Sequence, residues 1–290
     1  RLPRALLAFA AGAAFSVCGA IMQSVLRNPL ASPFTLGVSS GASLGAGAVI
    51  LFGSRLGAGA AGIAGFAGAA SLISVPLAGF LASLATIYLL LGLSRAIDPS
   101  LEGTTVILAG MVLSLFLNAA LSLLSALSKG PINRLISWQM GSFALKGWGP
   151  LAVVSLVAAG GCAAAFLFRR ELDILSFGDD AAFPMGLNAS RARAVLTAVA
   201  SLVTGAVVSF TGVIGFVDLA VPHLVRRVSG PSHATLVPLS ALLGGSLMTL
   251  ADLVARVAIP PLDLPVGAVT AALGAPFFAY AFLASRRGRA

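Results

Sequence analysis

Nine stretches of this chain are apolar enough to cross a membrane, and the charged residues stand almost entirely in the gaps between them. Only 9% of the residues are charged and 58% are hydrophobic, whereas a water-soluble domain carries about a quarter charged residues. In lipid, every backbone N–H and C=O group needs a partner within the protein, so helical bundles and closed barrels are the available solutions. Because the apolar runs are long and do not alternate with polar residues, the sequence predicts an all-α, polytopic membrane helical bundle.

The predicted spans form a single membrane domain over residues 1–290, because helices of about 20 residues leave little chain for a soluble domain. The third span is too long for one straight crossing, and Pro76 is expected to kink it or to mark a helix start. The seventh is too short for a full crossing, and short or broken helices at membrane depth are typical of a transport path. The nine spans are residues 5–26, 37–52, 60–93, 102–127, 151–168, 193–213, 214–225, 235–258 and 266–284.

Lysines and arginines are divided unequally between the two sides of this bundle. The side with the larger share is predicted to be cytoplasmic by the positive-inside rule, and it consists of residues 27–36, 94–101, 169–192, 226–234 and 285–290. An odd number of spans then places the first residue outside, so we expect one earlier helix and ten spans in the full protein. The cytoplasmic group is Arg27, Arg95, Arg169, Arg170, Arg191, Arg226, Arg227, Arg286, Arg287 and Arg289, and the external group is Arg1, Arg4, Arg55, Lys129, Arg134, Lys146 and Arg256.

The net charge of +9 and the isoelectric point near 11.2 are high enough for a nucleic-acid-binding protein. The basic residues form no patch, however, and stand singly or in pairs at span ends, where they set topology and contact anionic headgroups. The expected surroundings are therefore the lipid bilayer, with no nucleic-acid partner. Cys18 and Cys162 lie within apolar spans and are expected to be small buried residues, which argues against a disulfide framework or a metal site.

The segment Gly37-Val38-Ser39-Ser40-Gly41 matches the G-x-S-x-G motif of serine hydrolases. That motif holds its serine on a strained strand-to-helix turn, beside a histidine and an acid. No strand is predicted before this segment, and His223 and His233 are the only histidines of the chain. The four-residue spacing of the glycines at positions 37, 41 and 45 instead predicts a flat helix face for close packing. An intramembrane hydrolase that uses Ser39 stays as one alternative function of the chain.

Two carboxylates, Asp218 and Asp252, fall within apolar spans. A carboxylate at membrane depth is costly, and it suggests a functional site such as a proton relay unless a cation pairs with it. Both residues lie near span ends or broken segments, where Arg226 or Arg256 is the expected partner. We therefore expect structural pairing for Asp218 and Asp252, with a role in gating as the alternative.

The two histidines give no metal or cofactor signal. His223 follows Pro222 at the end of the seventh span, so it is expected to cap or pack a helix. His233 stands in a short basic loop and is expected to be solvated. Neither histidine is predicted to bind a ligand.

Residues 169–192 form the longest hydrophilic stretch on the predicted cytoplasmic side. Charged residues alternate there with isolated large apolar residues, and glycines bound a short helix expected around Asp179–Met185. Apolar anchors on a short exposed helix are typical of a docking site for another protein. The chain contains no G-x-x-x-x-G-K-[ST] nucleotide-binding motif. If ATP drives this transporter, the ATPase is therefore a separate chain.

Seven blocks of sequence, in order along essentially the whole chain, resemble the FecCD-type permeases. These are the membrane subunits of type II ABC importers for iron–siderophore complexes, haem and cobalamin. The blocks are Arg1-Leu2-Pro3-Arg4; Gly19-Ala20-Ile21-Met22-Gln23 with Arg27-Asn28-Pro29-Leu30-Ala31-Ser32-Pro33; Leu36-Gly37-Val38-Ser39-Ser40-Gly41-Ala42; Trp138-Gln139-Met140-Gly141-Ser142; Gly178-Asp179-Asp180-Ala181 with Gly186-Leu187-Asn188; Pro222-His223-Leu224-Val225-Arg226; and Leu264-Pro265-Val266-Gly267 with Leu273-Gly274-Ala275-Pro276-Phe277.

The resemblance implies a homodimer in the bacterial inner membrane, with two ATP-binding subunits on the cytoplasmic side and a periplasmic binding protein outside. This chain then binds no cofactor, and ATP and Mg²⁺ belong to the ATPases. The family's external arginines, which meet glutamates of the binding protein, correspond to Arg1, Arg4 and Arg256, and we expect them to be exposed. The residues implied to contact the ATPases are Gly178, Asp179, Asp180, Ala181, Phe183, Met185, Gly186, Leu187, Asn188 and Arg191.

Two positions depart from the family pattern. Asp218 stands where a glycine is common and brings a carboxylate into a short, broken helix, while Asp263 replaces a glutamate before Leu-Pro. The leading hypothesis is the permease subunit of an ATP-driven importer that works by alternating access. The alternative is an ion- or proton-coupled secondary transporter with Asp218 and Asp252 as coupling carboxylates. The substrate stays open between a siderophore complex, haem and cobalamin.

Overall fold

The computed structural model describes residues 1–60, 67–128 and 130–287, and their side chains except those of 54–60, 67–74, 180–181 and 277–287. Helices dominate these ranges, and no strand forms in them beyond one bridge between Ile259 and Leu262. The all-α prediction is therefore confirmed for the described residues. The helices are α1 (Leu2–Val25), α2 (Val38–Ala60), α3 (Ala67–Ile97), α4 (Gly103–Leu127), α5 (Ile132–Gln139), α6 (Trp148–Leu167), α7 (Arg169–Phe177), α8 (Asp179–Ala182), α9 (Ala189–Thr211), α10 (Val217–Ser229), α11 (His233–Val257) and α12 (Val266–Arg287).

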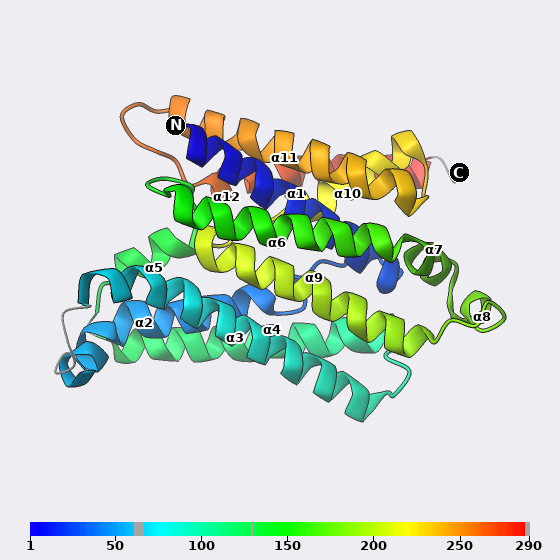
Figure 1. Cartoon of the computed structure of the whole chain (residues 1–290), viewed down its shortest axis with the longest axis horizontal. Helices are drawn as coiled ribbons and strands as arrows, with labels where there is room; N and C mark the ends of the chain where they lie inside the picture. The colour runs from blue at the N-terminus through cyan, green and yellow to red at the C-terminus, as the bar shows by residue number, and fades with distance from the viewer. Residues whose placement is uncertain (61–66, 129, 288–290) are drawn as a thin grey trace.

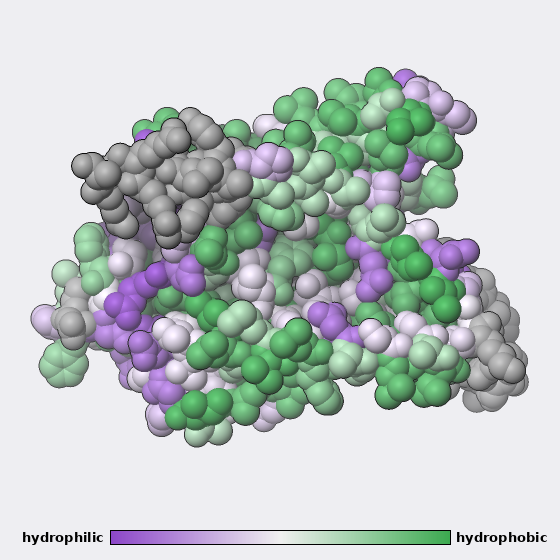
Figure 2. Space-filling view, turned by 180° about the vertical axis from the view of Figure 1, so that it is seen from behind, coloured by the Kyte–Doolittle hydropathy of each residue, from purple (hydrophilic) through white to green (hydrophobic). Residues whose placement is uncertain are grey.

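Two helices, α1 and α9, form the centre of the bundle. In the most apolar part of α1, 83% of the residues are buried, and 72% in α9, against 28% in both α4 and α6. The central α1 packs against α6, α9, α10 and α11, and α9 also contacts α2 and α3 (Figure 1). The outer faces of α4 and α6 expose large apolar side chains such as Leu115, Phe116 and Leu156. Figure 2 shows hydrophobic residues across the middle of one whole face, a surface that suits lipid or a second membrane subunit.

Six described helices are long and apolar enough to cross a membrane: α1, the Val75–Ile97 part of α3, α4, α6, α9 and α11. Val38–Gly53 and Val266–Pro276 are shorter apolar segments. The prediction of nine spans is therefore not confirmed. The seventh predicted segment, residues 214–225, was expected to be too short for a full crossing, and it is: α10 has only 13 residues, and residues 212–216 before it are not helical. A helix of that length is too short for the hydrocarbon core of a bilayer, which is about 30 Å thick.

Glycines make the closest helix contacts. A Cβ atom on Gly12 of α1 would lie 2.2 Å from the carbonyl oxygen of Gly244 in α11. A Cβ atom on Gly41 of α2 would lie 2.1 Å from Thr86 Oγ1 of α3. Gly45, one turn further along α2, also faces α3, so two of the three glycines expected to give α2 a flat packing face do so.

The third glycine of that spacing, Gly37, has a different role. Its φ of +90° lies in the left-handed region that glycine adopts without strain, and α2 begins at the next residue. The residues before it form turns and no strand. Ser39 therefore sits in the first turn of a packed helix, and the strand-to-helix turn that a serine hydrolase needs is missing at this position.

The chain loses helical structure between α9 and α10, at residues 212–216. Gly212 has φ +77°, and Gly141, in the loop after α5, has φ +70°. The Ser142 amide donates to the Thr211 carbonyl at 2.8 Å, and the Val266 amide donates to the Gly141 carbonyl at 3.1 Å. The end of α9, the loop after α5 and the start of α12 are thus joined by backbone hydrogen bonds where the helix is broken. Backbone groups that are buried away from water need such partners.

The two ends of the bundle differ in what they carry. Figure 1 shows α7 and α8 at one end, and the N-terminus, α5 and the α11–α12 connection at the other. Residues 169–192 and the three arginines assigned to docking therefore lie at opposite ends, as the charge distribution predicts. In Figure 2 hydrophilic residues gather toward the left edge, on the side of α7 and α8. Five basic residues used in that prediction have side chains outside the described residues: Arg55, Lys129, Arg286, Arg287 and Arg289.

Replacement of Gly12 by Leu should disrupt the packing of α1 on α11, because the new side chain would meet the Gly244 carbonyl and Met248. Overpacking a buried contact typically costs about 1–3 kcal/mol, so thermal unfolding in detergent should show a clearly lower melting temperature. Gly160→Leu is the matched control, since nothing lies within 4 Å of a Cβ atom at that exposed position. Equal melting temperatures for the two variants would contradict the assigned packing.

Candidate functional site

The end of the bundle that carries α7 and α8 holds the predicted docking segment. In α7, Leu172 and Leu175 are buried, so one face of this short helix is fixed to the bundle. Phe177, at its last position, is exposed. The helix α7 itself was not predicted, because its nine residues are too few to give a clear period in so charged a stretch.

The residues after α7 form a small projecting unit. Its helix, α8, covers only Asp179–Ala182, so the expected helix of Asp179–Met185 is too long by one turn. Gly178 and Gly186 bound the unit with φ values of +108° and +72°. Phe183 and Met185 are 88% and 65% exposed, so the projecting unit presents two large apolar side chains at this end of the bundle. Leu187, Asn188 and Arg191, which were also predicted to contact the ATPases, follow this unit. The Asn188 side chain accepts a hydrogen bond from the Arg191 amide at the start of α9. The side chains of Asp180 and Ala181 lie outside the described residues.

Arg193 attaches this unit to the bundle, a role to which no residue pattern pointed. Its side chain is 1% exposed. It donates to the carbonyls of Val25, Ser100 and Leu101 at 2.8–3.3 Å and pairs with the Asp179 carboxylate at 2.5 Å. One guanidinium therefore ties the end of α1, the α3–α4 connection and α8 together. The first turns of α9 carry two arginines, Arg191 and Arg193, and charges at the end of an apolar helix usually set topology, so the buried role of Arg193 was missed.

A second buried polar cluster lies beside α7. His233, the first residue of α11, is 1% exposed, so the expectation that it is solvated is wrong. Its Nδ1 lies 2.6 Å from Asp173 Oδ1 of α7, and its Nε2 lies 2.7 Å from Ser24 Oγ of α1. Arg226 of α10 also donates to Ser24 Oγ, at 2.9 Å, and to the side-chain carbonyl of Gln23. The cluster thus connects α7 to three helices of the membrane bundle.

Asp218 does not pair with Arg226, so that expectation is wrong. The Asp218 carboxylate is buried in the first turn of α10 and accepts a hydrogen bond from Ser32 Oγ. A carboxylate is stabilised at a helix N-terminus by the free amides and the helix dipole. Asp218 therefore holds the 31–36 loop against the start of the short helix. Pro222 and His223 lie inside α10 and not at a helix end, contrary to expectation.

The opposite end of the bundle carries a row of paired charges. Asp252, with no exposed side-chain surface, lies 2.9 Å from Arg4 Nη2 and 3.3 Å from Arg256 Nε. Arg4 also reaches Asp263, at 2.8 Å. Arg256 is the partner expected for Asp252, and Arg4 is an additional one. The expectation that Arg4 is exposed is wrong, because only 15% of its side chain is accessible, whereas Arg1 is exposed and Arg256 is 26% accessible.

The apolar bundle, the broken central helix and the projecting unit at one end define a multi-pass membrane permease. The chain matches the model of the FecCD transport family over residues 1–284, and it belongs to this family. It is therefore the permease subunit of an ABC importer.

Relatives and a solved structure agree with this assignment. The chain is 37% identical to the hemin transport system permease HmuU of Yersinia pestis, over 100% of this chain and 83% of that protein. It is 39% identical to the cobalamin import system permease BtuC of Halobacterium salinarum, over 97% and 71%. Its fold resembles that of a metal-chelate type ABC transporter in an inward-facing conformation, with a TM-score of 0.85, 28% identity, and coverage of 98% of this chain and 87% of that one.

Arg193→Met should destabilise the bundle, because the buried carbonyls of Val25 and Leu101 lose their donor, together with the carbonyl of Ser100 and the half-exposed carboxylate of Asp179. A buried acceptor that is left without a donor typically costs about 1–3 kcal/mol, so the melting temperature should fall clearly. Arg191→Met is the control, since Arg191 is exposed and no side-chain bond is found for it among the described residues. If Arg193→Met and Arg191→Met melt alike, Arg193 is not the anchor of this end.

Proposed function

We propose that this permease works as a homodimer in the bacterial inner membrane and docks two ATP-binding subunits through residues 178–191. ATP and Mg²⁺ are bound by those subunits, and this chain carries no cofactor. The observation that carries the proposal is the exposure of Phe183 and Met185 on a unit that Arg193 fixes to the bundle. Large apolar side chains on a rigid projection are typical anchors for a groove in a partner protein.

The contacts behind the projecting unit support its use in coupling. A force applied to α8 reaches Arg193 through Asp179, and from there the ends of α1 and α3. A force applied to α7 reaches α1 and α11 through Asp173, His233 and Ser24. Movement of the ATPases would therefore displace the central helix α1 directly. Coupling of this kind needs a contiguous chain of packed and bonded groups, and these two routes provide one.

On the opposite end, we propose that Arg1 and Arg256 contact acidic side chains of a periplasmic binding protein. Arg4 supports them indirectly, because it offsets one of the two negative charges of Asp252 and Asp263, so the group with Arg1 and Arg256 keeps a net positive charge. Of the three arginines predicted to dock the binding protein, Arg1 and Arg256 keep that role in this proposal, and Arg4 positions them. The secondary-transporter alternative is disfavoured, since Asp252 is already paired with Arg4 and Arg256 and has no exposed surface.

The cargo is proposed to be a metal chelate or a corrinoid. Relatives carry the names of import permeases for hemin, cobalamin, iron(3+)-citrate and iron(3+)-hydroxamate. All of these are compact molecules that bind a metal. Uptake of each labelled candidate into vesicles that contain the complete transporter would identify the cargo.

Replacement of both Phe183 and Met185 by Asp should weaken ATPase binding, because charged groups would have to be desolvated in an apolar groove. Truncated interface anchors typically cost about 2 kcal/mol each, so co-purification of the ATPase should fall at least tenfold. Val228→Asp is the control, since Val228 is 89% exposed at the same end but lies outside the segment. Normal ATPase recovery with the double variant would remove residues 178–191 from the interface.

The docking arginines are best tested by combining Arg1→Glu with Arg256→Gln. Asp252 then keeps Arg4 as its partner, whereas Arg4→Glu would place a third carboxylate beside Asp252 and Asp263 and disturb the fold. Charge contacts at an interface rim mainly change association rates. We expect slower and weaker binding of the partner protein at low salt, and a smaller difference at 1 M salt, where the screening length is about 3 Å. A salt-independent effect, or none at low salt, would exclude the proposed contact.

A further inference from the structure

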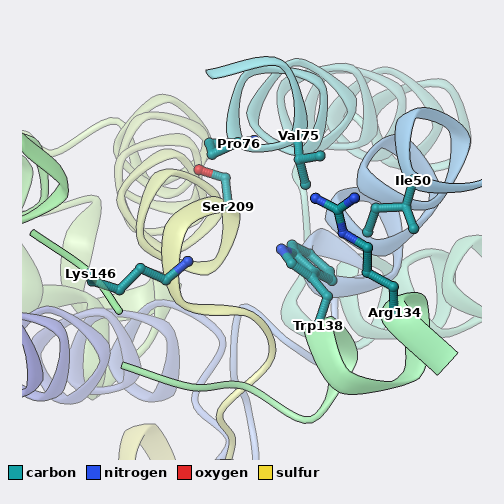
Figure 3. A pocket seen from close by; sticks show the side chains of 7 residues that line it. All are labelled: Ile50, Val75, Pro76, Arg134, Trp138, Lys146 and Ser209. Atoms are coloured by element: carbon teal, nitrogen blue, oxygen red, sulfur yellow. The ribbon is translucent and has the colours of Figure 1, made fainter. Parts of the chain in front are cut away.

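A cavity of about 240 Å³ lies beside the broken helix, in the half of the bundle that carries the docking arginines. Its walls come from α2, α3, α5, α9 and the loop before α6 (Figure 3). The lining residues are Ile50, Val75, Pro76, Arg134, Trp138, Lys146 and Ser209. None of them belongs to the docking or coupling surfaces described above.

The polar atoms of this cavity are almost all hydrogen-bond donors. Figure 3 shows the Arg134 guanidinium and the Trp138 indole nitrogen on one side, with the Lys146 ammonium directed inward from the other. Arginine, lysine and the indole N–H can donate but cannot accept. Ser209 uses its hydroxyl proton on the Ala206 carbonyl, at 2.7 Å, and keeps its oxygen as the one acceptor group.

In the part of the chain that the structure describes, neither cation is paired with a carboxylate. The chain has nine acidic residues, and none lies among residues 1–97 or 103–170, the ranges that supply every wall except Ser209. The carboxylates found near the docking end, Asp252 and Asp263, are bound to Arg4 and Arg256. Among the described residues, no ion pair or side-chain hydrogen bond is found for Arg134 or Lys146. Burial also lowers the pKa of Lys146, because desolvation penalises the charged ammonium.

We propose that this cavity binds a carboxylate-bearing anion, and that it receives the carboxylate edge of the transported chelate. Arginine binds carboxylates through two parallel hydrogen bonds, and lysine and the indole N–H add donors around them. The volume is below the 300–1,000 Å³ of sites that enclose a whole drug-sized ligand. The cavity therefore takes one anionic group, while the rest of the chelate stays in the passage outside it.

The inference rests on the proposed function and narrows its substrate class. Citrate complexes of iron and the propionates of haem present carboxylates. The hydroxamate groups of an iron–trihydroxamate complex neutralise the metal and present none. The corrin amides of cobalamin are likewise uncharged. A carboxylate-binding cavity thus favours iron–carboxylate complexes or haem as cargo.

The chain offers a built-in reporter for this site. It contains two tryptophans, Trp138 in the cavity and Trp148, which is not among its lining residues. A Trp148→Phe background leaves Trp138 as the single fluorophore. The full-length permease in nanodiscs of zwitterionic lipid should then show a saturable change in fluorescence with citrate. Triethyl citrate, which has the same skeleton without the charges, should give none.

In this background, Arg134→Gln and Lys146→Gln should each weaken citrate binding about tenfold or more, since each removes a charge-assisted hydrogen bond. Neither change breaks a contact found among the described residues, so the melting temperature should stay unchanged. Arg95→Gln is the matched control, because Arg95 is exposed at the opposite end and its loss changes the net charge equally.

Three outcomes would overturn the proposal: no saturable response to citrate, an equal response to triethyl citrate, or unchanged affinity in the Arg134→Gln/Lys146→Gln double variant. A response to phosphatidylglycerol in the nanodisc, with none to citrate, would assign the cavity to a lipid headgroup instead. These measurements need no ATPase and no binding protein. Failure of ATP-driven uptake with intact citrate binding would therefore count against the proposed coupling arrangement and leave the cavity assignment standing.

Discussion

Backbone hydrogen bonding away from water is the constraint on which this structure depends. The helix that would continue from α9 is interrupted at residues 212–216, and the Thr211 carbonyl accepts a hydrogen bond from Ser142 in the loop after α5. The carbonyls of Met140 and Gly141 in turn accept from the first amides of α12. Space for this crossing is created by glycine, since a Cβ atom on Gly212 would lie 2.1 Å from the Trp138 carbonyl. The family block Trp138-Gln139-Met140-Gly141-Ser142 therefore serves to close the break. The cavity lined by Trp138 and Ser209 lies directly beside it, so the unusual backbone and the proposed anion site are one local arrangement.

The buried arginines at the two ends of the bundle have different kinds of hydrogen-bond partners. Arg193 and Arg226 are held mainly by carbonyl and side-chain oxygens, with a single carboxylate between them. Arg4 is held by two carboxylates. A guanidinium that binds several carbonyls fixes the ends of several helices at once, which suits the force transmission proposed for that end. Arg4, which is bound by two carboxylates, fixes the N-terminal part of α1 to α11, and Asp252 of α11 also holds Arg256.

The sequence was a good guide wherever the controlling pattern is local. Hydrophobic runs predicted the helices, and glycine spacing predicted a flat packing face on α2, although not that α3 packs on it. It failed where a partner is distant along the chain. His233 seemed solvated because its neighbours are polar, yet its partner Asp173 lies 60 residues away. Arg4 seemed exposed, yet its partner Asp252 lies 248 residues away. Arg193 was missed since its partners are chiefly carbonyl groups, which no residue pattern can indicate.

The scarcity of acidic residues links these observations to function. Of nine carboxylates, six have an identified structural use: Asp98 in its own turn with Ser100, Asp173 with His233, Asp179 with Arg193, Asp218 with Ser32, and Asp252 and Asp263 with Arg4. Few are left to neutralise the 18 lysines and arginines. The surplus of cations includes Arg134 and Lys146, for which no carboxylate partner is found among the described residues. The proposed anionic chelate would therefore meet no carboxylate of the described chain that already occupies these two cations.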